Sequence, residues 1–134
     1  MELRATAFVL EDNKGTTRAA LAMASEGPAL VLYDENKKGR IQLRVIEGTP
    51  QLLLFDEEGR ARIQSTVIGD NAYLTLFDEK EKERIQSTVI GDTSRQDLVD
   101  EEGNTRINLN VSEDGPGLGL FDELGTWIWG CAKK

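Results

Sequence analysis

The Asp of the motif LFDE, or of the related motif in other units, recurs every 22 residues along this chain, and no insertion changes this spacing. A leucine stands two residues before each acid, and in five of the six units an arginine stands six residues after it. A fixed period of this length is the signature of repeat architecture. We therefore predict a single repeat domain over residues 1–134, with units anchored on Asp12, Asp34, Asp56, Asp78, Asp100 and Asp122.

The apolar residues within a unit have the spacing of β-strands. Leu30 and Leu32, and then Ile41 and Leu43, alternate with other residues at period two. Most units place a Gly within five residues after the Asp, which is the preference of a type I turn in a short hairpin loop. Helical repeats do not fit, because glycine falls in the middle of the unit and the pattern of leucine-rich repeats is absent. The prediction is an all-β fold of six tandem 22-residue β-hairpin repeats, about twelve short antiparallel strands in a barrel-like or solenoid-like meander.

Both faces of the expected strands carry apolar residues. The repeated Leu and Ile slots are expected to form the inner face, whereas Val31, Leu53 and Ile68 lie between these slots and belong to the other face. A strand that is apolar on both faces has to be covered on both. The sequence leaves two solutions open: the sheet closes on itself with a second layer, or another copy of the chain covers it.

The repeated Asp and Arg are interpreted as structural. Asp at the start of a turn accepts backbone N–H hydrogen bonds, and an arginine six residues later is placed to pair with it or with the neighbouring Glu. Stacked strands lie about 4.8 Å apart, so unpaired carboxylates in register would repel, and the interleaved arginines relieve this repulsion. The functional alternative is a ladder of carboxylates that binds cations or a basic partner.

Composition excludes several classes of partner. The net charge of −8 and the pI of about 4.6 disfavour binding to nucleic acid or to an anionic membrane surface. No apolar run approaches the roughly 20 residues that a transmembrane helix needs, and no signal-peptide pattern opens the chain, so we expect a soluble protein without membrane insertion. The compartment is not indicated, because a single cysteine, Cys131, excludes only an internal disulfide.

Catalytic and metal-binding residues are not apparent in the sequence. The chain has no histidine, so it lacks the Ser-His-Asp and Cys-His arrangements and the commonest metal ligand. Asp and Glu recur in every unit and nothing singles out a catalytic pair, while the calcium-loop pattern is interrupted at Lys14 and Lys38. We expect no enzyme activity, no metal and no cofactor. Cys131 takes a slot held by Leu or Ser in other units and is expected to be a small core residue.

The ligand-binding candidates are Trp127 and Trp129, the two tryptophans of the chain. They lie two residues apart, which predicts that they share one side of a strand, as a platform for a sugar or a partner or as a cap on the last hairpin. The fifth unit also departs from the pattern, with polar residues such as Arg95, Asp97 and Asn108, for which solvation is the simple explanation.

The unit LVLYDENKKGRIQLRVIEGTP, with LLLFDEEGRARIQ and EDGPGLGLFDELG, resembles repeats of uncharacterised bacterial proteins built on L-x-L-[YF]-D-x-x-G-x-x-R. The resemblance extends from Phe8 to Trp129 and implies a bacterial or phage context, but no assigned activity. The chain departs from the pattern in DEKEKE, which lacks the turn glycine, and at Ser65 and Ser87, where the pattern has leucine.

The sequence therefore favours a non-enzymatic structural or protein-interaction module that assembles as a homo-oligomer. The alternative is a lectin-like domain that binds a glycan or another small ligand through Trp127 and Trp129.

Overall fold

The computed structural model describes residues 4–132 and confirms the all-β prediction. Within these residues the chain forms twelve strands and no helix. The strands are β1 (Ala7–Glu11), β2 (Thr17–Ala24), β3 (Gly27–Tyr33), β4 (Gly39–Ile46), β5 (Thr49–Phe55), β6 (Ala61–Ile68), β7 (Asn71–Phe77), β8 (Glu83–Ile90), β9 (Thr93–Val99), β10 (Thr105–Ser112), β11 (Gly115–Phe121) and β12 (Trp127–Ala132).

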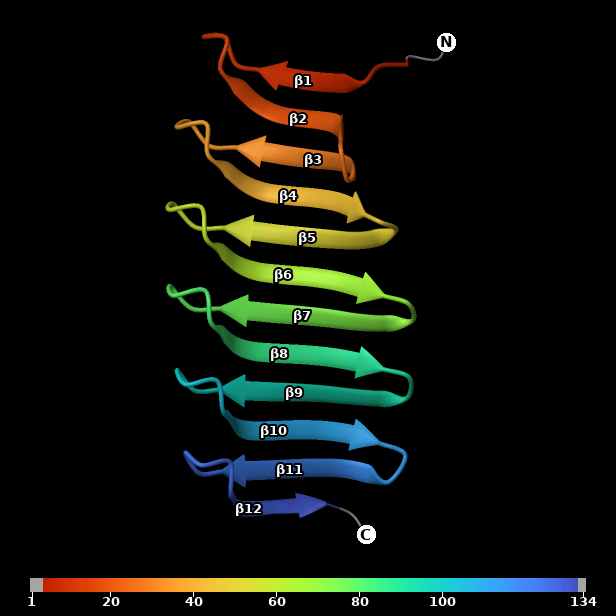
Figure 1. The fold of residues 1–134 in the computed structure, drawn as a ribbon, viewed down its shortest axis with the longest axis vertical. Coiled ribbons are helices and arrows are strands. Elements are labelled where there is room, and N and C mark those ends of the chain that lie inside the picture. The colour runs from red at the N-terminus through yellow and green to blue at the C-terminus, as the bar shows by residue number, and fades with distance from the viewer. Residues whose placement is uncertain (1–3, 133–134) are drawn as a thin grey trace.

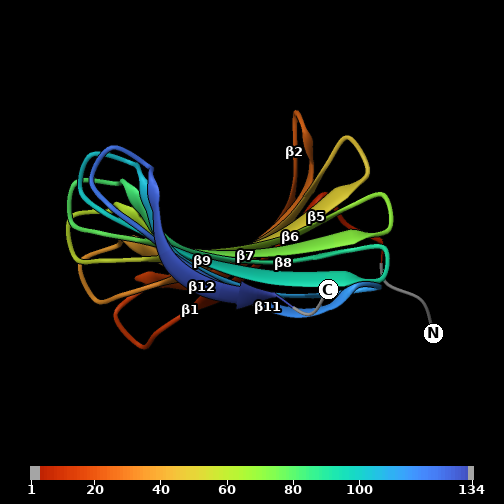
Figure 2. The ribbon, with the colours of Figure 1, turned by 90° about the horizontal axis from the view of Figure 1, so that it is seen from below.

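Each strand pairs antiparallel with its neighbours in the sequence, so the spatial order is β1 to β12 without a crossover. The result is one open meander with β1 and β12 at its two edges (Figure 1). The single layer is strongly twisted along its length and curved (Figure 2), as right-twisting strands require. The barrel-like alternative is not adopted, because β1 and β12 do not meet.

The turn inside each unit, here called the Asp turn, is the hairpin loop expected from the sequence. In the third unit the Gly59 amide donates to the Asp56 carbonyl at 3.1 Å, and the Asp56 amide donates to the Arg60 carbonyl at 3.0 Å. Gly59 has a φ of 85°, the left-handed conformation that glycine adopts without steric cost. Lys37 and Glu81 occupy the same slot with φ values of 63° and 59°, so these two units make the turn without glycine.

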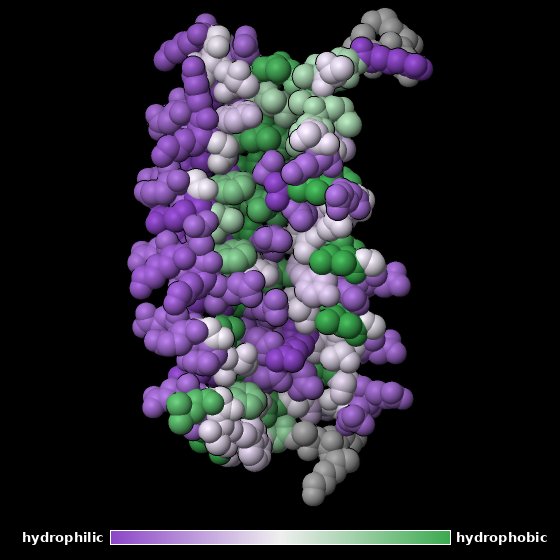
Figure 3. Space-filling view, in the orientation of Figure 1, coloured by the Kyte–Doolittle hydropathy of each residue, from purple (hydrophilic) through white to green (hydrophobic). Residues whose placement is uncertain are grey.

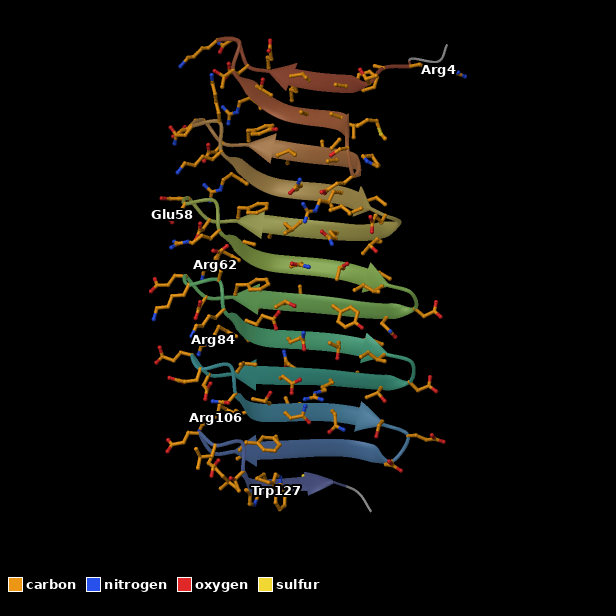
Figure 4. The ribbon with its side chains drawn as sticks, viewed as in Figure 1. Arg4, Glu58, Arg62, Arg84, Arg106 and Trp127 are labelled. Atoms are coloured by element: carbon orange, nitrogen blue, oxygen red, sulfur yellow. The ribbon has the colours of Figure 1, made fainter. Side chains whose placement is uncertain are left out.

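A β-bulge follows every Asp turn and explains where the arginines stand. In the third unit Leu54 pairs with Ile63 but Phe55 pairs with Ala61, which leaves Arg62 as the extra residue. The extra residues in the other units are Arg18, Arg40, Arg84, Arg106 and Ile128. A bulge re-aims the side chain of the extra residue, and here it directs the arginines toward the Asp turns (Figure 4).

Strand pairing divides the side chains between two faces. We call face A the one that carries the aromatic slot before the Asp, such as Phe55, and face B the one that carries the preceding leucine, such as Leu54. Face A is turned to the viewer in Figure 1 and Figure 4. The expectation that the Leu and Ile slots form a covered inner face is wrong for the single chain: among the described apolar side chains only Leu53 is buried, and it belongs to face A. Nothing among residues 4–132 packs on face B, since the sheet is a single layer.

Candidate interaction surface

Face B is largely apolar along the sheet, and its strand rows away from the Asp turns carry no charge. Its central row, followed from one strand to the next by the pairing register, is Phe8, Leu21, Leu30, Leu43, Leu52, Ser65, Leu74, Ser87, Gln96, Leu109, Leu118 and Cys131. The rows on either side are built in the same way, and no described strand position on this face, apart from the bulge arginines beside the Asp turns, carries a charge. Leu43 and Leu74 remain 46% and 41% exposed.

The surface area of the chain is larger than that of a globular protein of the same mass. The solvent-accessible surface is 9636 Å². A globular monomer of 14.9 kDa exposes about 7,000 Å². The difference of about 2,600 Å² is the consequence of folding into one layer instead of two.

Two hollows lie on face B on either side of β6. The larger, about 660 Å³, is lined among others by Leu74, Ser87 and Leu109, and the smaller, about 430 Å³, by Leu30, Leu43 and Leu52. Ser65 lines both. The serines that replace the leucine of the repeat therefore leave room in the middle of the face, and Ser87 accepts a hydrogen bond from Gln96 Nε2 at 3.3 Å.

Face A differs from face B in carrying a row of polar side chains. Its central positions include Gln42, Gln64, Gln86 and Asn108, one each from β4, β6, β8 and β10. Figure 3 shows this face, with hydrophilic side chains along the side of the Asp turns and over parts of the centre, mainly in its lower half. The sequence carried a signal for this row in the Gln that follows Ile in three units, but it was not recognised as a surface feature.

The polar residues of the fifth unit do not form a solvated patch. Asp97 is only 7% exposed at the centre of face A. Its carboxylate accepts hydrogen bonds from Arg95 Nη2 at 2.9 Å and Asn108 Nδ2 at 2.7 Å, and Arg95 Nε lies 2.6 Å from Oδ2. A buried carboxylate needs such partners. The solvation explanation is therefore wrong for Asp97, which is the centre of a paired cluster.

The six repeated aspartates are occupied by their own turns. One carboxylate oxygen of each accepts the backbone amides of the second and fourth residues after it; for Asp78 these are Lys80 at 2.8 Å and Lys82 at 3.1 Å. In the first five units the second oxygen faces the bulge arginine of the same unit, as in the contact of 3.3 Å between Asp78 Oδ2 and Arg84 Nη1. This geometry supports the structural interpretation of the Asp and Arg repeat.

The hydrogen bonds lower the pKa of all six carboxyls below the ordinary value of 3.8. At Asp78 the backbone amide of Lys82 contributes most to the lowered pKa. At Asp56 partial burial raises the pKa and is the largest single influence, but the backbone and side-chain hydrogen bonds from Arg60 outweigh it. Asp56 also has a second arginine, Arg62, at 3.6 Å.

The bulge arginines link each unit to the next. Arg40, Arg62, Arg84 and Arg106 each donate from Nε to a backbone carbonyl 15 residues later, at 2.8–3.0 Å. Lys38 Nζ and Lys82 Nζ make comparable hydrogen bonds to the carbonyls of Glu57 and Glu101 in the following units. In the first unit Arg18 Nε is buried without a hydrogen-bond partner among the described residues.

Trp127 and Trp129 do not share one side of β12. The bulge at Ile128 pairs Trp129 with Leu120 and Trp127 with Phe121, so Trp129 lies on face B and Trp127 on face A. Trp127 Nε1 lies over Gly119 and Gly130, whose missing side chains leave space for the indole. The tryptophans remain 61% and 55% exposed. Cys131 is likewise exposed on the edge strand, so the expectation of a core cysteine is wrong for the single chain.

Over residues 4–132 no three Asp, Glu or Cys side chains are close enough to hold a metal ion. No helix in this part of the chain is long and apolar enough to cross a membrane. No family model matches the chain, and no curated protein matches its sequence.

Proposed function

We propose that this chain is a non-enzymatic structural or protein-interaction module that assembles with further copies of itself through face B. The observation that carries the proposal is an apolar, uncharged and uncovered face on a chain with about 2,600 Å² of excess surface. Monomeric proteins rarely expose contiguous apolar patches larger than a few hundred Å². A stable interface removes about 800 Å² from each partner, which face B is large enough to supply.

A second copy suits face B in charge and in shape. The acidic and basic side chains of the described residues lie in the turns at both ends of the strands and on face A, so the strand rows of two B faces can meet without bringing like charges together. Two sheets with the same right-handed twist pack face to face with their strands aligned within about 30°, as in β-sandwiches. Assembly would turn the exposed Leu and Ile rows into the core that the repeat pattern specifies.

The test is the molar mass in solution, measured by light scattering over a concentration series. Val89 on face B and Ile90 on face A are neighbours in β8 and are both 49% exposed. Val89→Lys is expected to dissociate the oligomer, because assembly would bury an ammonium group among leucines. Ile90→Lys adds the same charge on the other face and is expected to leave the mass unchanged. A monomeric wild-type chain, or equal effects of the two substitutions, would overturn the proposal.

A second candidate is the binding of a glycan or small molecule on face A. It is favoured by the combination of Trp127, stacked aromatic slots and the neighbouring amide row, since sugar recognition combines aromatic faces with amide hydrogen bonds. A glycan panel read by tryptophan fluorescence tests it with matched variants. Binding that is lost in Trp127→Ala and kept in Trp129→Ala supports this candidate, and an unchanged signal over the whole panel removes it.

A further inference from the structure

The two edge strands of the sheet leave backbone groups unpaired at its two ends. Strands β1 and β12 each have one neighbour, so each presents backbone N–H and C=O groups on its outer side. Their side chains are apolar and open: Leu10 is 64% exposed and Ile128 is 61% exposed. Proteins usually protect such edges with lysine, proline or charge. Glu11 is the single charged residue of β1, and β12 has none.

The register inside the chain shows which partner these edges match. Each unit meets the next by pairing its second strand with the first strand of its neighbour, and the residue after the bulge always faces the leucine two before the Asp. The five pairs are Ala19–Leu32, Ile41–Leu54, Ile63–Leu76, Ile85–Leu98 and Ile107–Leu120. Trp129 and Leu10 occupy these same two slots at opposite edges of the sheet.

We propose that β12 of one copy pairs antiparallel with β1 of a second copy, with Trp129 opposite Leu10, so that the meander continues from chain to chain. The same register places Cys131 opposite Phe8 and the small Gly130 opposite Val9. Copies stacked in this way along the long axis of Figure 1 keep all Asp turns on one side of the sheet. The contact is head-to-tail and its two surfaces differ, so it builds an open chain of copies unless the rotation closes a ring.

The junction is weaker than four of the five junctions within the chain. At those four a bulge arginine ties one unit to the next, as Arg106 Nε does to the Phe121 carbonyl at 2.9 Å. Ile128 stands at this position in the last unit and has no such donor. The edge contact is therefore reversible and dependent on concentration. It extends the proposed self-assembly but is made by the backbones of the two edge strands instead of by side chains along the whole of face B, so the two contacts fail or succeed separately.

A disulfide ladder tests the register directly. Directly paired residues of antiparallel strands have Cβ atoms about 4.5–5.5 Å apart. The single substitution Phe8→Cys, together with the native Cys131, is expected to give covalent dimers, trimers and longer chains on mild oxidation. Phe8→Cys in a Cys131→Ser background gives dimers at most, and Leu21→Cys, in the same row of face B but on the inner strand β2, gives no ladder. Products no longer than dimers from Phe8→Cys would overturn the proposal.

A charge variant provides an independent measurement by sedimentation velocity. Val9 lies on face A of β1 and is 55% exposed, so Val9→Lys blocks the edge without touching face B. In this variant the average mass is expected to stop rising with concentration, while the face-B oligomer persists. In Val89→Lys the face-B oligomer is expected to dissociate, while the association through the edges persists. Ile90→Lys serves as the control for the added charge. Growth that is unaffected by Val9→Lys would contradict the edge contact and leave the face-B contact untouched.

Discussion

Arg62 donates a hydrogen bond from Nε to the backbone carbonyl of Phe77, 2.9 Å away and one unit further along the chain. The same guanidinium lies 3.6 Å from Asp56 of its own unit. The arginine thus connects the repeated Asp of its own unit to the end of the strand that comes just before the repeated Asp of the next unit. Because each unit contacts only its neighbours, such links contribute directly to the coupling between units.

Removing one of these links is expected to destabilise the chain at the junction it spans. Arg84→Met deletes the hydrogen bond to the Val99 carbonyl at 2.8 Å and the contact with Asp78. We expect the free energy of unfolding to fall by ~1.5 kcal/mol, the lower end of the range for a hydrogen bond to a charged group, because the Arg84 side chain is partly exposed. Urea unfolding at fixed protein concentration measures it. Lys80→Met is the control, because Lys80 makes only a 3.9 Å exposed ion pair and is expected to change the midpoint little.

The lowered pKa values of the six aspartates predict a loss of stability in acid. A carboxyl whose folded pKa is lowered stabilises the folded state above its unfolded pKa, and this contribution is lost as the pH falls through the folded value. The loss of stability therefore begins as the pH falls to about 4, close to the ordinary pKa of 3.8, and continues at lower pH. Asp78→Asn should be less stable than the wild type at pH 7, and the difference should narrow as the pH falls.

Circular dichroism during urea unfolding at several pH values measures this narrowing. Asp70→Asn, which removes a carboxylate from a turn between units, is the matched control. A difference between Asp78→Asn and the wild type that stays constant from pH 7 to 3 would show that the Asp78 carboxylate contributes through its shape alone.

Glycine at the two exceptional Asp turns is expected to stabilise the protein. Glu81 holds a φ of 59° in the slot that Gly59 fills in another unit. The left-handed conformation costs a non-glycine residue roughly 1–2 kcal/mol, and the larger unfolded-state entropy of glycine offsets part of the gain. We expect Glu81→Gly to raise the unfolding free energy by about 0.5–1 kcal/mol. The converse change, Gly59→Ala, should lower it, although no atom lies within 4 Å of the added Cβ, because the penalty is in the backbone.

The period of 22 residues was sufficient to predict the strands, the Asp turns and the order of the sheet. These features are local: alternation sets the strand faces, and each turn makes its own hydrogen bonds. The openness of the sheet was not predictable, because closure depends on the summed twist and curvature of all strands. The burial of Asp97 was missed for a related reason, since its partner Asn108 is 11 residues away and comes from the next strand.

The placement of the tryptophans was wrong for a specific reason. Period two assigns Trp127 and Trp129 to one face only if the strand between them is regular. The register shift that puts Arg62 outside the alternation in the third unit puts Ile128 outside it in the sixth. The position of the bulge is visible in the sequence as the arginine six residues after the Asp. Its consequence, that the residues on either side of the bulge lie on opposite faces of the sheet, appears only when the strand pairing is known.

This division of the tryptophans makes them reporters for the two contacts and for ligand binding. A Trp127→Phe variant keeps only Trp129, which lies on face B beside Leu120, and a Trp129→Phe variant keeps only Trp127, on face A beside Phe121. Association through face B should shift the emission of Trp129 to shorter wavelength with increasing concentration and leave Trp127 unchanged. Both tryptophans lie in the edge strand β12, so edge pairing could change the emission of either one. The comparison is therefore made in a Val9→Lys background, where the edge contact is blocked and a shift reports on face B alone. Equal shifts of both in that background would mean that face A is covered as well, and the assignment of face B as the assembly surface would then be contradicted.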